Sequence, residues 1–108
     1  MSTSPVVYVV QDSKKNVVSA MDFGSIEIIL PEGVQITFAA APTVRRIREA
    51  MHKFNENDYI IAIGDPVAIG IACAVASERT GGKFKMLKWD RQENRYYPVT
   101  VDIEPQYL

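Results

Sequence analysis

The sequence predicts one α/β domain built on a mixed sheet, and three observations lead to this expectation. The length of 108 residues suits a single domain. The composition, 47% hydrophobic and 23% charged, is that of an ordinary globular protein. Strand-like and helix-like segments alternate from residue 34 to residue 89. Because crossover helices usually join parallel strands, we expect a parallel β-α-β-α-β centre over 34–89, with antiparallel additions from the N-terminal strands and a C-terminal hairpin.

The first third of the chain predicts short strands. Residues 6–10 are rich in valine, and residues 17–20 are expected to return as the second strand of a hairpin. Residues 26–30 predict a further strand. Residues 34–39 alternate between apolar and polar side chains, so we expect them to form the first strand of the parallel centre.

Two helices are expected in the middle of the chain. The first begins near Pro42 and runs to Phe54, with apolar residues at spacings of three and four. The second begins at Pro66 with Asp65 as its N-cap and ends at Gly81. This second helix has no polar side chain up to residue 76, so it should be the more buried one. Its Gly70 predicts a close approach of the backbone to the sheet, or else to a helix of a partner.

The remaining strands are expected on either side of the second helix. Residues 59–63 form an unbroken apolar run, which is typical of a strand covered on both faces. Residues 83–89 and 95–103 predict a hairpin. Pro98 places the last strand at an edge of the sheet, because proline has no N–H to donate to a neighbour.

Composition and termini favour a soluble cytoplasmic protein. The net charge of −1 argues against non-specific wrapping around nucleic acid, and the one cysteine, Cys73, excludes an internal disulfide. The chain starts without the pattern of a signal peptide, and its longest apolar run, 67–76, is half a membrane span. We expect one domain over 1–108, with loose termini at about 1–4 and 104–108.

The sequence holds no recognisable catalytic constellation. His52 is the only histidine and has no second metal ligand three or four positions away. Cys73 lies among alanines in the more buried helix, where burial raises a thiol pKa, so a packing role is favoured. No phosphate-loop or dinucleotide glycine pattern occurs. We therefore expect no catalytic residue, no resident metal and no cofactor.

Topology nevertheless offers a candidate ligand site, because ligands of open α/β sheets bind at the carboxyl ends of the parallel strands. Two carboxylates there are suited to Mg²⁺ and three arginines to an anion. The alternative is that the two carboxylates only cap a helix and open a hairpin turn. The residues of this candidate site are Thr43, Arg45, Arg46, Asp65, Asp90 and Arg91.

The C-terminal hairpin offers a second candidate, because it interleaves aromatic and cationic side chains. Single-stranded nucleic acid is bound by stacking of bases on aromatic rings together with contacts to phosphates. The alternative is that the tryptophan packs across the hairpin against a tyrosine. The residues of this candidate interface are Lys88, Trp89, Arg91, Arg95 and Tyr96.

Several long stretches carry a family resemblance. They are Asp58 to Ala76, Lys85 to Glu93, Arg95 to Pro98, Ala20 to Gly24 and Pro42 to Arg46. In these stretches the chain resembles small proteins of tailed bacteriophages, including phages of marine bacteria. The resemblance implies a phage protein made in the cytoplasm of a bacterial host, and it assigns no activity and no catalytic residue.

Three hypotheses about function follow. The first is a non-enzymatic phage accessory protein that binds a protein partner, either a second copy of itself or a host factor. The second is a small-ligand or nucleotide-binding module, with Mg²⁺ held at the carboxyl edge of the central strands. The third is a protein that binds single-stranded nucleic acid through its hairpin.

Overall fold

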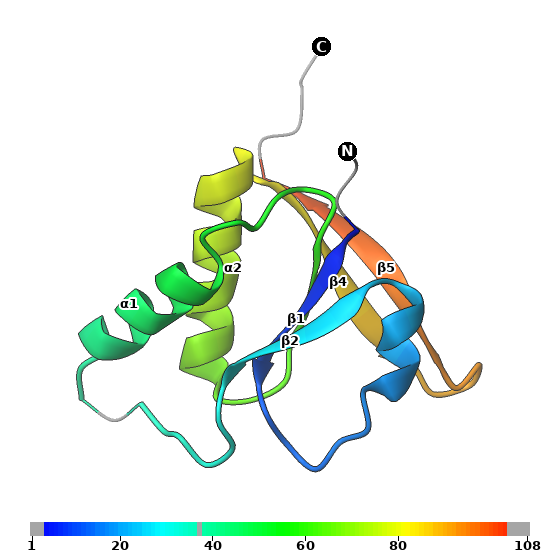
Figure 1. Ribbon diagram of the computed structural model, residues 1–108, viewed down its shortest axis with the longest axis horizontal. Helices are drawn as coiled ribbons and strands as arrows, with labels where there is room; N and C mark the ends of the chain where they lie inside the picture. Colours follow the sequence, from blue (N-terminus) through cyan, green and yellow to red (C-terminus); the bar gives the residue numbers. More distant parts are fainter. Residues whose placement is uncertain (1–3, 37, 104–108) are drawn as a thin grey trace.

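The computed structural model describes residues 4–36 and 38–103, which form one five-stranded sheet with two α-helices on one face (Figure 1). The α/β class and the mixed sheet are confirmed. The expectation of loose termini falls largely on residues outside the described ranges. In chain order the elements are β1 (Val6–Gln11), the 3₁₀ helix η1 (Val18–Asp22), β2 (Ser25–Leu30), α1 (Ala41–Ala50), β3 (Tyr59–Ile61), α2 (Pro66–Thr80), β4 (Lys83–Asp90) and β5 (Arg95–Asp102).

The strand order is β2-β1-β3-β4-β5, and only the β4–β5 pair is antiparallel. The antiparallel C-terminal hairpin is confirmed, and Pro98 stands in the edge strand β5 as expected. The expectation of antiparallel N-terminal strands is wrong, because β1 pairs in parallel with both β2 and β3. Its run of valines is buried on both faces, which is the pattern of an interior parallel strand.

Two segments expected as strands have other structures. Residues 17–20 enter η1 instead of a hairpin, and the Asn16 side chain accepts a hydrogen bond from the Val18 N–H at 2.9 Å. Such an asparagine turn competes with strand pairing. Within 34–39, the described residues form an irregular connection. One of the alternating apolar side chains, Ile36, packs against the core.

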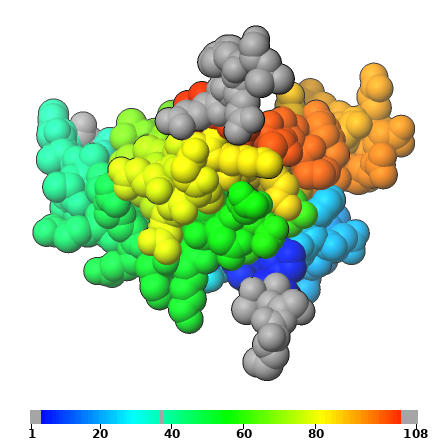
Figure 2. Space-filling model, turned by 90° about the horizontal axis from the view of Figure 1, so that it is seen from above, coloured from blue at the N-terminus to red at the C-terminus, as the bar shows by residue number. Residues whose placement is uncertain are grey.

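The two faces of the sheet are covered differently. Across the sheet, the chain moves in one direction from β1 to β2 and in the opposite direction from β2 through β3 to β4. Because crossovers between parallel strands are right-handed, connections that run in opposite directions lie on opposite faces of the sheet. Accordingly, α1 and α2 lie on one side and η1 on the other (Figures 1 and 2). Tyr8, Ile60 and Phe84 belong to the core under the helices, whereas Val9 and Ile61 belong to the core under η1. We call the second side, which carries η1 but no α-helix, the helix-free face.

Both helices begin near their expected residues. The Oδ1 atom of Asp65 accepts a hydrogen bond from the Val67 N–H at 2.8 Å, which confirms the N-cap of α2. Gly81 ends this helix in the left-handed conformation, at φ 69°. The first helix is shorter than expected and ends at Ala50, although Phe54 still packs into the core beyond it. Neither helix in the described part of the chain is long and apolar enough to cross a membrane.

The expected close approach of the sheet to Gly70 is wrong, and the alternative, a helix of a partner, stays a prediction. A Cβ atom added at this position would have no neighbour within 4 Å, so neither the sheet nor α1 approaches the backbone there. This side of α2 is open, and Val67 is half exposed on it. Although α2 has few polar side chains, one of its faces therefore remains uncovered by the rest of the described chain.

Replacing Gly70 by alanine should stabilise the protein by about 0.5–1 kcal/mol, because alanine is the better helix former and its Cβ meets no atom. Urea unfolding followed by circular dichroism measures the change. The matched control is Gly64→Ala, which should destabilise, since Gly64 has φ +124° and a Cβ there would overlap Gln11. A loss of stability in Gly70→Ala would contradict the open surface.

Candidate functional site

The side chain of Gln11 bridges the segments that meet at the carboxyl ends of β1 and β3. This residue ends β1 and is 5% exposed. Its Nε2 donates to the carbonyl oxygens of Pro31 at 3.1 Å and Val34 at 2.6 Å, and its Oε1 accepts from the Asp65 N–H at 2.8 Å. We call these three hydrogen bonds the Gln11 latch. Strand order reverses between β1 and β3, where open α/β sheets usually bind ligands. Here the latch spans that position, and an open hollow of about 320 Å³ remains beside it, lined in part by Gln11, Asp12 and Asp65.

Asp65 is held beside the latch by two contacts of its own. Besides capping α2 through Oδ1, it accepts a hydrogen bond from the Ile36 N–H through Oδ2 at 3.3 Å. Both carboxylate oxygens therefore bind backbone N–H groups. The side chain fixes the start of α2 against the connection that follows β2.

Asp90 has a separate structural role in the hairpin. Its Oδ1 accepts hydrogen bonds from the N–H groups of Gln92 at 2.9 Å and Glu93 at 3.3 Å. These bonds close the turn between β4 and β5, and Asn94 completes it with φ 56°. The alternative interpretation of both aspartates, as a helix cap and a turn opener, matches these contacts.

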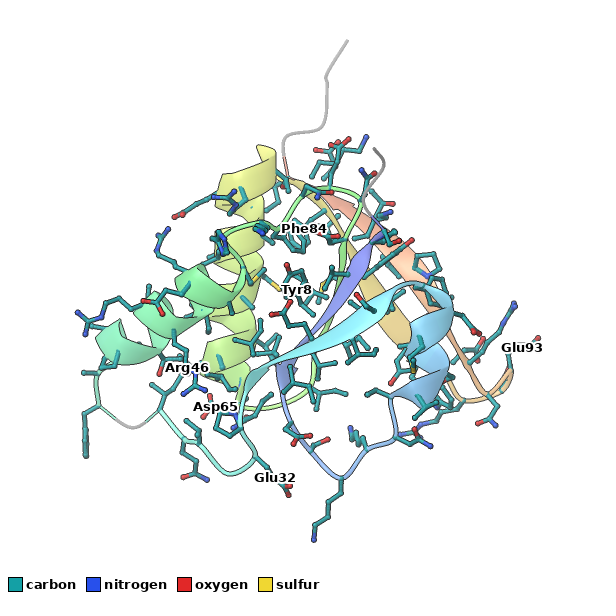
Figure 3. The ribbon with its side chains drawn as sticks, viewed as in Figure 1. Tyr8, Glu32, Arg46, Asp65, Phe84 and Glu93 are labelled. Carbon is teal, nitrogen blue, oxygen red and sulfur yellow. The ribbon has the colours of Figure 1, made fainter. Side chains whose placement is uncertain are left out.

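The other members of the candidate ligand site are distributed over distant elements. Thr43, Arg45 and Arg46 lie on α1, and Arg91 lies in the hairpin turn. Figure 3 shows Arg46 on one side of the molecule and the hairpin turn, marked by Glu93, on the opposite side. Among the described residues, no group of three or more His, Cys, Asp or Glu side chains is placed to hold a metal ion. A ligand role for the six residues stays a prediction.

The candidate nucleic-acid interface is divided between the two faces of the hairpin. Trp89 pairs with Tyr96 on the helix-free face, and the adjacent pairs, which include Lys88 and Arg95, point to the other face. The rings of Trp89 and Tyr96 meet edge to face, with centroids 4.9 Å apart. Burial raises the pKa of the Tyr96 hydroxyl. The tryptophan thus packs across the hairpin, and its neighbouring cations lie on the opposite face.

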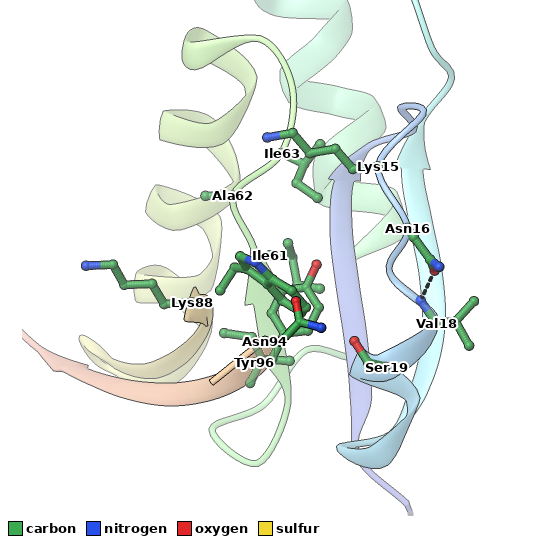
Figure 4. Close-up of a pocket in the computed structure, with 12 residues that line it drawn as sticks. Lys15, Asn16, Val18, Ser19, Ile61, Ala62, Ile63, Lys88, Asn94 and Tyr96 are labelled. Carbon is green, nitrogen blue, oxygen red and sulfur yellow. Dashed lines mark hydrogen bonds between the residues drawn. The ribbon is translucent and has the colours of Figure 1, made fainter. Parts of the chain in front are cut away.

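The helix-free face contains a hollow of about 870 Å³ between the segment leading into η1 and the β4–β5 hairpin (Figure 4). The floor consists of the buried side chains of Ile61, Ile63 and Leu87. Trp89 and Tyr96 form the aromatic wall. The opposite wall is formed by Lys15, Asn16, Val18 and Ser19. We call this the open-face hollow.

Only the aromatic wall of this hollow was expected from the sequence. Trp89, Tyr96 and Lys88 were predicted as part of a nucleic-acid interface on the hairpin alone, and that role stays a prediction. Lys15 to Ser19 were missed because residues 17–20 were expected to pair as a strand. The one available signal was the connection from residue 12 to residue 24, which is long enough for a crossover to a parallel strand.

Cys73 and Tyr8 lie in environments that reduce their reactivity, and His52 contacts a backbone carbonyl. Cys73 is half-buried on α2, and burial raises the pKa of its thiol, which lowers the thiolate fraction at neutral pH. Burial also raises the pKa of Tyr8 to about 12. His52 is exposed after α1, with Nδ1 2.9 Å from the Glu49 carbonyl oxygen. These contacts suit structural roles for all three side chains.

Fold and site together define a two-layer α/β domain with a strand-end crevice bridged by Gln11 and a hollow in its helix-free face. The chain belongs to the family described as Phage Pam3 gp32-like protein, whose model matches residues 5–103. The membership confirms the resemblance to phage proteins. No curated protein and no solved structure matches the chain.

Replacing Gln11 by leucine should lower the free energy of unfolding by about 2–4 kcal/mol, because each buried polar group left without its partner costs about 1–3 kcal/mol. Three groups are left, two carbonyl oxygens and the Asp65 N–H, and because they are only partly buried their combined cost is below the full sum. Urea unfolding measures the loss. The matched control Gln35→Leu, at an exposed position nearby, should change stability little. Equal stability of Gln11→Leu and the parent would refute the latch.

Single-stranded DNA should leave the fluorescence of Trp89 unchanged at physiological salt, because the aromatic pair and the neighbouring cations point to opposite faces. Trp89 is the only tryptophan, so the signal is unambiguous. Titration with an oligonucleotide tests this directly. Quenching that weakens with salt and disappears when Lys88 and Arg91 are replaced would show instead that the hairpin binds nucleic acid.

Proposed function

We propose that this protein is a non-enzymatic phage accessory protein that binds a protein partner through its helix-free face. The observation that carries the proposal is the open-face hollow together with the exposed apolar side chains around it. Val18 is 64% exposed, Met21 60%, Ile28 45% and Trp89 40%. Apolar side chains gathered on one face, with polar groups at their margin, are typical of a protein interaction site.

The extent of the apolar surface favours a protein over a small ligand. Val18 and Trp89 line the hollow, but Met21 on η1 and Ile28 on β2 lie outside it. A small molecule in the hollow would leave these two side chains in water. A protein surface can cover the hollow and its margin together, with aromatic residues as the central contacts.

The chemistry of the hollow suits binding more than catalysis. The polar side chains among its described lining residues are lysines, asparagines, a serine and a tyrosine. Carboxylates, histidine and cysteine, which serve most often as general bases or nucleophiles, are not among them. The proposed partner is a second copy, another phage protein or a protein of the host cytoplasm.

Photo-crosslinking in infected bacteria tests the proposal. A crosslinking amino acid placed at Val18 and, separately, at Asn94 samples both walls of the hollow, and one placed at Glu49 on α1 samples the opposite side of the molecule. We expect the same partner protein to be captured from Val18 and Asn94 and not from Glu49. Capture from Glu49 alone would contradict the proposal.

The purified partner then allows a quantitative test. Trp89→Ala should weaken binding at least about ten-fold, as expected for a central aromatic contact. The matched control is Val99→Ala, because Val99 is 38% exposed on the opposite face of the same hairpin. Val18→Glu provides a second variant that leaves the Trp89–Tyr96 contact intact. Unchanged binding in both Trp89→Ala and Val18→Glu would refute the proposal.

A further inference from the structure

We infer that the open-face hollow receives an acidic segment of the partner that carries one large apolar side chain. This inference rests on the proposed function and adds the chemistry of the bound segment. It follows from three properties of the hollow: the charge around it, its apolar floor and the hydrogen-bond donors in its wall.

The charge around the hollow is positive. The lining includes Lys15 and Lys88 and, among its described residues, no carboxylate. The whole chain, by contrast, has a net charge of −1. The hollow is therefore a positive region on a slightly negative protein, which favours an acidic partner.

The two lysines contribute unequally. Figure 4 shows Lys15 extending toward Ile63, whereas Lys88 points away from Tyr96 to the outside. Lys15 is thus placed to pair with a carboxylate on a bound segment. Lys88 acts at longer range, and its effect is more easily screened by salt.

The floor of the hollow requires an apolar group. Ile61 and Leu87 are at most 4% exposed and Ile63 is 9% exposed, so their aliphatic surfaces offer no polar atom to a ligand. The Trp89 ring is held at the side by its edge contact with Tyr96. Because these groups are already ordered, a leucine or phenylalanine side chain can be buried there with little loss of side-chain entropy in the protein.

The polar wall presents donors to the backbone and carboxylates of a bound segment. The Oδ1 atom of Asn16 already accepts from the Val18 N–H, so the amide of this side chain has its N–H groups left to donate (Figure 4). Lys15 is a donor only. An acidic segment supplies hydrogen-bond acceptors for both Asn16 and Lys15, whereas the charged side chains of a basic segment are themselves donors.

A pair of synthetic peptides tests the inference. The probes are acetyl-Glu-Leu-Glu-Phe-Glu-amide and its counterpart with glutamine in place of each glutamate. We expect the acidic peptide to bind roughly five-fold more tightly at low salt, the gain that one or two exposed ion pairs supply, and the difference to shrink with added salt. Trp89 fluorescence measures affinity, and backbone amide shifts in NMR spectra locate the site at Asn16, Ile63 and Asn94.

Three charge variants sharpen this test. Lys15→Gln should remove most of the preference for the acidic peptide, and Lys88→Gln should remove less, because its side chain points outward. Lys53→Gln, at an exposed position after α1, should leave the preference unchanged.

Several outcomes would overturn the inference. These are equal affinity for the two peptides, no binding of either at millimolar concentration, and shifts confined to another surface. Binding of AMP with Mg²⁺, accompanied by a change in Trp89 fluorescence and no peptide binding, would assign the hollow to a small ligand. If a partner is crosslinked from Val18 and Asn94 while the peptides fail, only the acidic character of the bound segment is refuted. If no partner is captured there, the proposed function itself fails.

Discussion

The carboxamide of Gln11 connects the parts of the molecule that meet at one end of the sheet. It joins the end of β1, the connection after β2 and the start of α2 through three hydrogen bonds. Asp58 acts similarly at the other end of β1, where its carboxylate accepts from the N–H groups of Val6 at 2.9 Å and Asn55 at 3.0 Å. The interior strand is therefore clamped at both ends by buried polar side chains. Such groups are costly to bury unless satisfied, so they fix one arrangement of the loops around them.

The strand order explains why one face is open and the other covered. The β1–β2 crossover is short and contains only η1, which covers the part of the helix-free face nearest β1 and β2. The longer crossovers place α1 and α2 together on the other face. The Gln11 latch spans the strand-end crevice, where a hollow of about 320 Å³ remains, and the uncovered area over β3 and β4 forms the larger open-face hollow of about 870 Å³.

Local signals predicted the second half of the chain well. Asp65, Pro66 and Gly81 mark the limits of α2 because caps and stops act within a few residues, and the apolar run after Tyr59 identified a strand buried on both faces. The place of β1 between β2 and β3 was not predictable in this way, because pairing joins residues about 50 positions apart. The open-face hollow was missed for the same reason. Its two walls come from distant segments, and only the tertiary fold brings Asn16 opposite Trp89.

The latch and the hollow are physically connected although they lie on different sides of the sheet. The side chain of Gln11 bridges the crevice, while its backbone N–H donates to the carbonyl oxygen of Ile63 at 3.0 Å. Ile63 lies beyond the last paired residue of β3, so this bond helps to hold it in the floor of the hollow. The next residue, Gly64, must be a glycine because a Cβ would overlap Gln11. The residue that spans the usual ligand position of this kind of sheet thus also shapes the surface proposed to bind a partner.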